Sequence, residues 1–126
     1  MAGELETVVH EMFAALDRND ADGVIRMGAK DMQGIDEISR HWMRGLDEVG
    51  GYIRHLLTMV NNIRSSVKDV HETVIGDAGL VTCWLEQDYV LEGTRQHISA
   101  PTTMLFRRED GAWKILLFHS LPLPAE

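Results

Sequence analysis

The hydrophobic period of this chain changes once, at about residue 67, and that change limits the folds open to it. Before this point apolar residues recur at helical spacing, whereas after it they occur in strand-like runs. The expected helices are 4–17, 21–28 and 46–60, and the expected strands are 67–75, 80–91, 95–107 and 113–121. The short links between the strands permit only antiparallel neighbours. We therefore predict one α+β domain, residues 1–126, in which helices of the first half pack on a curved antiparallel sheet made by the second half.

The charge balance argues against several classes of partner. Lys and Arg total 12 and Asp and Glu total 20, which gives a formal net charge of -8. This sign repels phosphate groups, so neither nucleic acid nor a membrane surface is expected as a partner. The single cysteine, Cys83, excludes an intrachain disulfide and is interpreted as a small buried hydrophobe. No apolar run approaches the roughly 18 residues of a membrane span, and we expect a cytoplasmic protein.

Alternation in the two long strands assigns their inner faces. In 80–91 the inner face is apolar except for one amide, Gln87. In 95–107 the inner face includes Thr102 and Met104. Pro101 lies in the middle of this second strand and cannot donate a hydrogen bond to the sheet, so we expect a bulge there.

The last strand is apolar on both faces. The two sets are Leu116 and Phe118 on one side, and Trp113, Ile115 and Leu117 on the other. A strand of this kind needs cover on both faces, and the helices cover only one. A second copy of the chain is the natural cover for the other, which predicts a homodimer through the convex face. His119 is expected on that outer face, first as an interface residue and second as an acid or base of a pocket.

Two stretches carry a family resemblance. Phe13 to Asp22 and Asp110 to Ile115, continuing to Ser120, resemble the first helix with its following turn and the final strand of the nuclear transport factor two-like superfamily. This superfamily is also called the SnoaL-like or ketosteroid-isomerase-like fold. The resemblance covers nearly the whole chain and implies a cone, in which a curled sheet wraps around helices and a pocket opens at the wide end. Members include isomerases, polyketide cyclases, dehydratases, epoxide hydrolases and non-catalytic binding domains, so the fold does not settle the function.

The resemblance implies a catalytic base at Asp36. Ketosteroid isomerases carry a base aspartate just after the first short strand, nine residues before the glycine that precedes the third helix, and Asp36 and Gly45 hold those places here. Such a base would abstract a proton next to a carbonyl group or from water, which requires an apolar surrounding. The alternative interpretation is that Asp36 and Glu37 form a solvated acidic turn.

The oxyanion-binding partners of that family are absent. Met12 and Phe13 stand where the family has a tyrosine on the first helix, and Thr102 stands where it has a protonated aspartate. A threonine hydroxyl donates only one, weaker hydrogen bond to an oxyanion. We therefore do not expect the same steroid isomerisation. A related proton transfer, dehydration or cyclisation of a small apolar or polyketide- or steroid-like molecule, without a cofactor, is the leading hypothesis.

The resemblance also implies a pocket lining. Tyr52 would offer a hydroxyl, Gln87 a polar handle, and Trp42, on the expected second short strand, a ring near the mouth. The apolar walls would be Met12, Met27, Leu85, Met104 and Phe118. Ordinary packing is the alternative for each of these side chains.

Two competing functions remain open at this point. One is a non-catalytic ligand-binding domain with the same pocket, and the other is an association module that dimerises through the sheet. The six histidines form no short metal-binding motif. We expect no metal, although separate strands could bring His71, His97 and His119 together.

Overall fold

The computed structural model describes residues 3–124. Its elements are α1 (Glu4–Asp17), α2 (Ala21–Arg26), β1 (Gly28–Asp36), β2 (Met43–Arg44), α3 (Leu46–Met59), β3 (Val60–Ile75), β4 (Ala78–Leu91), β5 (Thr94–Glu109) and β6 (Ala112–Ser120). In this part of the chain no helix is long and apolar enough to cross a membrane.

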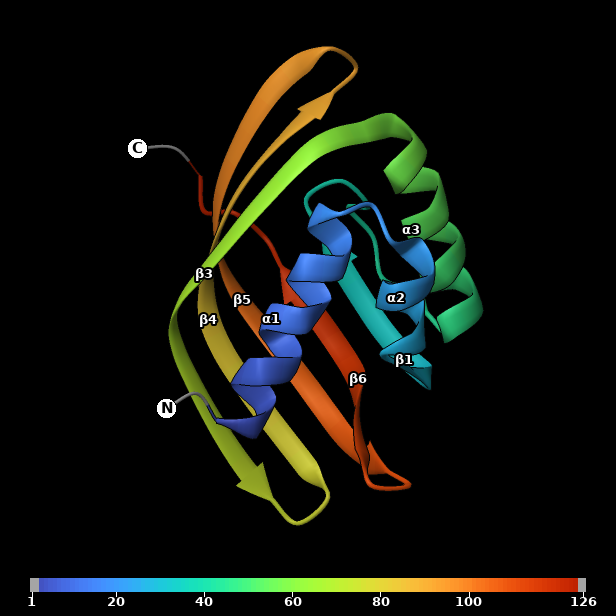
Figure 1. The fold of residues 1–126 in the computed structure, drawn as a ribbon, viewed down its shortest axis with the longest axis vertical. Helices are drawn as coiled ribbons and strands as arrows, with labels where there is room; N and C mark the ends of the chain where they lie inside the picture. Colours follow the sequence, from blue (N-terminus) through green and yellow to red (C-terminus); the bar gives the residue numbers. More distant parts are fainter. Residues whose placement is uncertain (1–2, 125–126) are drawn as a thin grey trace.

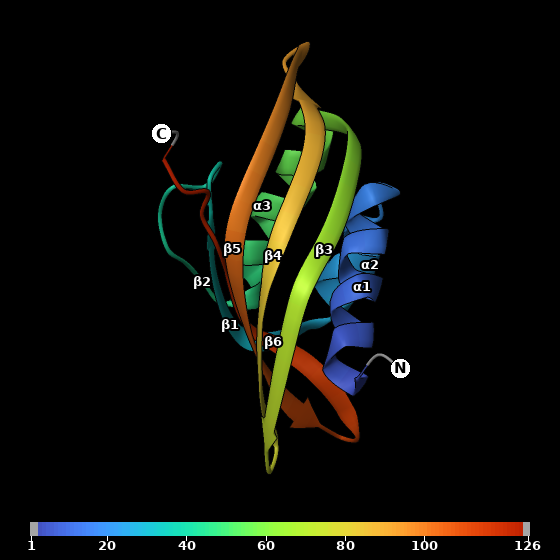
Figure 2. The ribbon, with the colours of Figure 1, turned by 90° about the vertical axis from the view of Figure 1, so that its left-hand side faces the viewer.

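The six strands form one sheet in the order β2-β1-β6-β5-β4-β3. All neighbours are antiparallel except β1 and β6, which are parallel. The long strands curve, and the three helices lie on their concave side (Figures 1 and 2). Helix α1 packs on β3, and α3 packs on β1. The predicted α+β fold, with N-terminal helices against a curved sheet, is confirmed, and the first half of the chain adds β1 and β2 to it.

The three predicted helices form close to their expected bounds. Helix α1 spans the predicted residues and buries Leu5, Val9 and Met12 on one stripe. The Asp20 side chain caps α2 by accepting a hydrogen bond from the Gly23 N–H at 2.9 Å. Helix α2 ends before the predicted residue 28, because Gly28 already pairs with β6.

Strand β3 begins seven residues earlier than the sequence indicates. Its first part is rich in Asn and Ser and shows no clear alternation, although it pairs with the end of β4. The register shifts between Asn61 and Arg64 and again between Lys68 and His71. Asn62 and Asp69, which lie within these shifts, both have a φ of 54°. These two bulges bend the strand around the helices.

The predicted bulge at Pro101 is wrong. Strand β4 pairs with β5 without a register shift from Ala78 to Leu91, and Pro101 stands opposite Trp84 in this ladder. The last pair between β5 and β6 joins Thr102 to Ser120, so no β6 residue is aligned with Pro101. A proline is tolerated where the neighbouring strand has ended.

A bulge at Leu116 reverses the alternation of β6. Phe106 pairs with Ile115 and Leu105 pairs with Leu117, so Leu116 is the extra residue. Trp113 and Ile115 are therefore buried in the core, with 7% and 2% of their surface exposed, and their predicted outer position is wrong. After the bulge, Phe118 and Ser120 face inward and Leu117 and His119 face outward.

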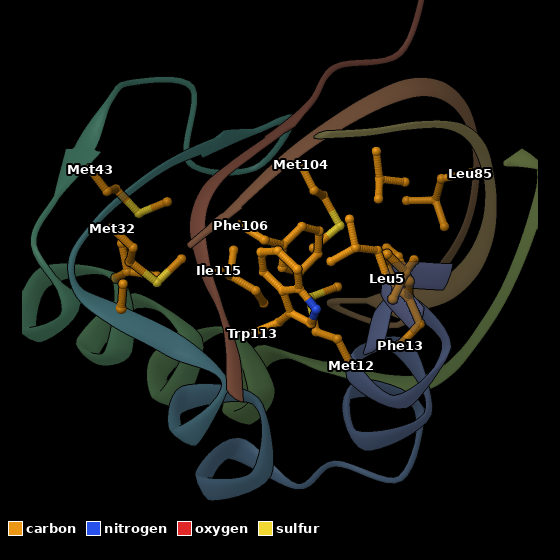
Figure 3. Packing of buried hydrophobic residues seen from close by; sticks show 14 residues of the cluster. Leu5, Met12, Phe13, Met32, Met43, Leu85, Met104, Phe106, Trp113 and Ile115 are labelled. Atoms are coloured by element: carbon orange, nitrogen blue, oxygen red, sulfur yellow. The ribbon is translucent and has the colours of Figure 1, made fainter. Parts of the chain in front are cut away.

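The main core fills the end of the molecule where α1 begins. Side chains of α1, β5 and β6 meet there, as Figure 3 shows for Leu5, Phe106 and Trp113. Near the other end of α1 the sheet and the helices diverge, and this end holds the pocket described below.

The reversed alternation of β6 predicts that two substitutions lower the free energy of unfolding by unequal amounts. Trp113→Ala opens a cavity in the core and should lower the free energy of unfolding by about 3–5 kcal/mol. Leu117→Ala removes a partly exposed outer side chain and should cost less than half as much. Urea unfolding of both variants measures this difference, and equal costs would contradict the bulge.

Candidate functional site

An apolar pocket lies between the three helices and the inner face of the sheet. Its cavity volume is about 90 Å³, and its walls come from all three helices and from β1, β2, β3, β4 and β6. Phe13 and Phe118 meet edge to face in this wall, with ring centroids 6.2 Å apart. Polar groups enter the pocket at only a few places, which is typical of a small-molecule site.

The end of β1 places two adjacent carboxyl groups at the pocket. Asp36 is the last residue of β1, and Glu37 begins the following turn. The Asp36 carboxylate accepts hydrogen bonds from the backbone N–H groups of Ile38 at 3.0 Å and Ser39 at 2.8 Å. Asp36 therefore caps its own turn, as aspartates often do, and this fixes the direction of its carboxylate.

Tyr52 supplies a third donor to the same carboxylate. Its hydroxyl, carried by α3, lies 2.8 Å from Asp36 Oδ1 and 2.9 Å from Oδ2. Burial, assisted by the negative charge of Asp36, raises the pKa of Tyr52 well above its ordinary range. Tyr52 is consequently a permanent hydrogen-bond donor at the pocket.

Glu37 is the titratable group of the pair. Burial, with the charge of Asp36 as the second cause, raises the pKa of Glu37 from 4.5 to about 7. The Tyr89 hydroxyl interacts with this carboxyl group and opposes part of the rise, while burial and the Glu37 charge raise the pKa of Tyr89 to about 12. A carboxyl group with a pKa near neutrality can both take up and release a proton at physiological pH.

A hydrogen-bonded chain of three residues, one each from α1, β3 and β4, reaches the pocket. Asp17, the last residue of α1, accepts from the Ser65 N–H at 2.9 Å and from the Ser65 hydroxyl at 2.7 Å. Gln87 Nε2 donates to the Ser65 hydroxyl oxygen at 3.0 Å. Gln87 is only 8% exposed and lines the pocket.

The structure brings six of the ten predicted site residues into the pocket lining. They are Asp36, Met12, Tyr52, Leu85, Gln87 and Phe118. These six come from five different elements, so their meeting depends on the fold rather than on local sequence.

The other four predicted site residues lie outside the lining. Met104 is fully buried in the core, and the Thr102 hydroxyl bonds to Ser120 Oγ at 2.8 Å and to the Ala100 carbonyl. Met27 follows α2 and packs against the main core. Trp42 precedes β2 and is 41% exposed, with its ring 5.8 Å from that of His119. The Trp42 ring therefore packs against β6, outside the lining, and its role at the mouth stays a prediction.

Three polar residues of the lining are absent from the predicted site residues. The sequence considers Glu37 only as part of a solvated acidic turn, although a turn that follows an inner strand can point into the cone. Tyr89 shares an inner face with Gln87, so alternation alone could have found it. Ser120 shares the inner face of β6 with Phe118, two residues earlier, so alternation alone could have found it as well.

The described residues offer neither a metal-binding site nor a reactive thiol. Within residues 3–124, no group of three or more His, Cys, Asp or Glu side chains is placed to hold a metal ion. Cys83 is buried, and burial raises the pKa of its thiol to about 11. A thiol of this kind is a poor nucleophile.

Comparison with known protein families assigns the chain to one of them. A family model described as the SnoaL-like domain matches residues 5–124. The chain therefore belongs to the SnoaL-like domain family, and the resemblance seen in the sequence is confirmed. A comparison with curated proteins finds no match.

Solved structures share the fold across almost the whole chain. A candidate dehydratase of the NTF2-like family from Streptomyces avermitilis has a TM-score of 0.85 and 20% identity, over 97% of this chain and 95% of that one. A ketosteroid isomerase-like protein from Erwinia carotovora atroseptica has a TM-score of 0.80 and 18% identity, over 95% and 94%. A candidate calcium/calmodulin-dependent protein kinase type II association domain from Thiobacillus denitrificans has a TM-score of 0.80 and 22% identity, over 94% of each chain. At these identities the likeness shows the fold alone.

The raised pKa of Glu37 predicts how stability changes with pH. Between its ordinary value of 4.5 and about 7, the folded protein holds a proton on Glu37 that the unfolded chain has lost. Stability from this group is present below about pH 4.5 and is lost as the pH rises through about 7. Glu37→Gln should therefore be more stable than the wild type by about 1–2 kcal/mol at about pH 8, since one pKa unit corresponds to about 1.4 kcal/mol.

Urea unfolding at a series of pH values measures this effect. The matched control is Glu11→Gln, because Glu11 is exposed on α1. A control that gains as much stability as Glu37→Gln at alkaline pH would show that the general negative charge of the protein, rather than Glu37, is responsible.

Proposed function

We propose that the chain is a cofactor-free enzyme that moves a proton on a small, mainly apolar carbonyl compound, with the Asp36–Glu37 pair as its acid–base centre. The observation that carries this proposal is the pair of adjacent carboxyl groups at one end of an apolar pocket. Paired carboxyl groups with different surroundings are a common means of acid–base catalysis at neutral pH.

The contacts of the two carboxyl groups support different roles. Asp36 is already held by three donors, so we assign it the parts of orienting Tyr52 and of raising the pKa of Glu37 by its charge. Glu37 takes the proton from the carbon next to the substrate carbonyl, and the electron pair moves onto the carbonyl oxygen. Return of that proton to another carbon completes an isomerisation, and its transfer to a departing hydroxyl group completes a dehydration.

The dimensions of the cavity favour a compact substrate. Its volume is about 90 Å³, whereas an apolar cavity of roughly 150 Å³ is known to bind benzene. Because this cavity is the smaller of the two, a compact molecule of at most one ring fits it better than a polyketide or steroid of several rings. The apolar walls supply most of the binding free energy for such a ligand.

Isotope exchange tests proton transfer without knowledge of the natural substrate. In D₂O the wild-type protein should accelerate exchange of the hydrogens next to the carbonyl group of acetophenone or cyclohexanone, as followed by NMR. Exchange should increase as the pH rises through about 7, because Glu37 must be ionised to accept the proton. Glu37→Gln should slow it by about 100-fold, and Asp36→Asn should slow it less.

Glu11→Gln is the control for this assay and should exchange both ketones at the wild-type rate. Bound ketone that exchanges only at the rate of buffer would contradict the enzyme proposal and favour the non-catalytic ligand-binding domain. Wild-type exchange in Glu37→Gln would contradict the role of that residue.

We also propose that the protein forms a homodimer through the outer face of the sheet. After the bulge, Leu117 and His119 of β6 face outward, and they pair with Leu105 and Thr103 of β5. The Trp42 ring lies against His119 at the edge of this surface. A partly exposed apolar patch on an open sheet is a common subunit contact.

Light scattering after size exclusion should give twice the chain mass of 14.2 kDa. Leu117→Asp should convert this dimer to a monomer, because it buries an unpaired charge in the interface. The control Val74→Asp, at an exposed position near the β3–β4 turn, should leave the mass unchanged. A monomeric wild-type protein at micromolar concentration would contradict the dimer.

A further inference from the structure

We propose that Asp17, Ser65 and Gln87 form a relay that fixes the amide of Gln87 with its oxygen toward the pocket, and so selects ligands that carry a hydroxyl or N–H donor. This inference rests on the proposed binding of a small molecule in the pocket but not on catalysis. It concerns the side of the pocket formed by β4, away from the backbone turn that holds Asp36.

The direction of the relay is set at Asp17. Both oxygens of its carboxylate accept hydrogen bonds from Ser65, one from the N–H at 2.9 Å and one from the hydroxyl at 2.7 Å. A serine hydroxyl has a single proton to donate. Since that proton is used toward Asp17, the Ser65 oxygen can only accept from any further partner.

Gln87 is that further partner, and its orientation follows. Only the NH₂ group of an amide can donate, so Gln87 must turn Nε2 toward Ser65, in agreement with the distance of 3.0 Å. The amide oxygen Oε1 then points away from Ser65. In the part of the chain that the structure describes, residues 3–124, no hydrogen bond reaches this oxygen.

Burial gives this acceptor its importance. Gln87 lines the pocket and is 8% exposed, between the apolar side chain of Leu85 and the ring of Tyr89 on the same face of β4. The buried side-chain atoms without a partner in the described residues do not include this oxygen, so it is open to the pocket, and a ligand that covers it without donating a hydrogen bond is unfavourable. A ligand with a hydroxyl or N–H group at this point satisfies it, whereas an apolar ligand of equal size does not.

The relay and the carboxyl pair together define a ligand with two functions. Gln87 and Tyr89 are two residues apart on one strand, about 7 Å between their Cα atoms, and the Tyr89 hydroxyl lies by Glu37. A compact molecule that reaches both places carries a carbonyl group at the carboxyl end and a donor at the amide end. The class this describes is a hydroxy- or amino-substituted carbonyl compound of about one ring.

Three ring ketones of similar size test this selection. The probes are three acetophenones that differ in the para substituent. The hydroxyl group of para-hydroxyacetophenone can donate a hydrogen bond, and the methyl group of para-methylacetophenone can neither donate nor accept one. The methoxy group of para-methoxyacetophenone can only accept. Their dissociation constants are measured by NMR titration of the labelled protein. The wild type should bind the hydroxyl compound about tenfold more tightly than the methyl compound, although the methyl group is the more hydrophobic.

Two variants separate the relay from simple pocket shape. Gln87→Met keeps the volume but removes the acceptor, and it should reverse the order of the hydroxyl and methyl compounds. Ser65→Ala frees the amide to turn its NH₂ group toward the pocket, so the methoxy compound should gain relative to the hydroxyl compound. Ser66→Ala, an exposed serine on the same strand, is the control and should keep the wild-type order.

The outcomes distinguish this inference from the proposed function. Equal binding of the hydroxyl and methyl compounds by the wild type would overturn the relay and leave the pocket and its proton transfer standing. An unchanged order in Ser65→Ala would overturn it too, even if Gln87→Met does not fold. Failure of all three probes to bind would overturn both the inference and the proposed function.

Discussion

The partial burial of two adjacent carboxyl groups at the end of β1 is the constraint on which the rest of the site depends. An apolar pocket disfavours two negative charges side by side, and the chain resolves this differently for each group. Asp36 receives three hydrogen-bond donors and is fully engaged. The hydrogen bonds of Glu37 offset only part of the effect of its burial and of the Asp36 charge, so its pKa rises to about 7. The end of β1 thus places a carboxyl group held by three donors beside one with an exchangeable proton.

Two polar places of the pocket are held in position by hydrogen bonds to neighbouring groups. The backbone of the turn and Tyr52 hold Asp36, while Asp17 acts through Ser65 on Gln87. Helix α1 therefore contributes to the site with its last residue as well as with its apolar face. Rigid support of this kind maintains polar groups in position when a ligand displaces solvent.

The sequence predicts the fold well because periodicity reports which face of each element is apolar. It located α1 to the residue and placed Gln87 on the inner face of its strand. It failed where one extra residue changes the face of a strand: the bulge at Leu116 moves Trp113 and Ile115 into the core. The long-range contacts of Asp17 with Ser65 and of Tyr52 with Asp36 also required the three-dimensional structure. No spacing along the chain indicates such pairs.

Direct titration of the Glu37 carboxyl group tests the central claim. Carbon-13 NMR of the side-chain carboxyl groups follows each one through its own transition. We expect a midpoint for Glu37 at about pH 7, and a lower midpoint in Asp36→Asn, because that substitution removes the neighbouring negative charge. A midpoint near the ordinary value of 4.5 in the wild type would contradict the account, since Glu37 would then be a solvated carboxylate with no proton to exchange at neutral pH.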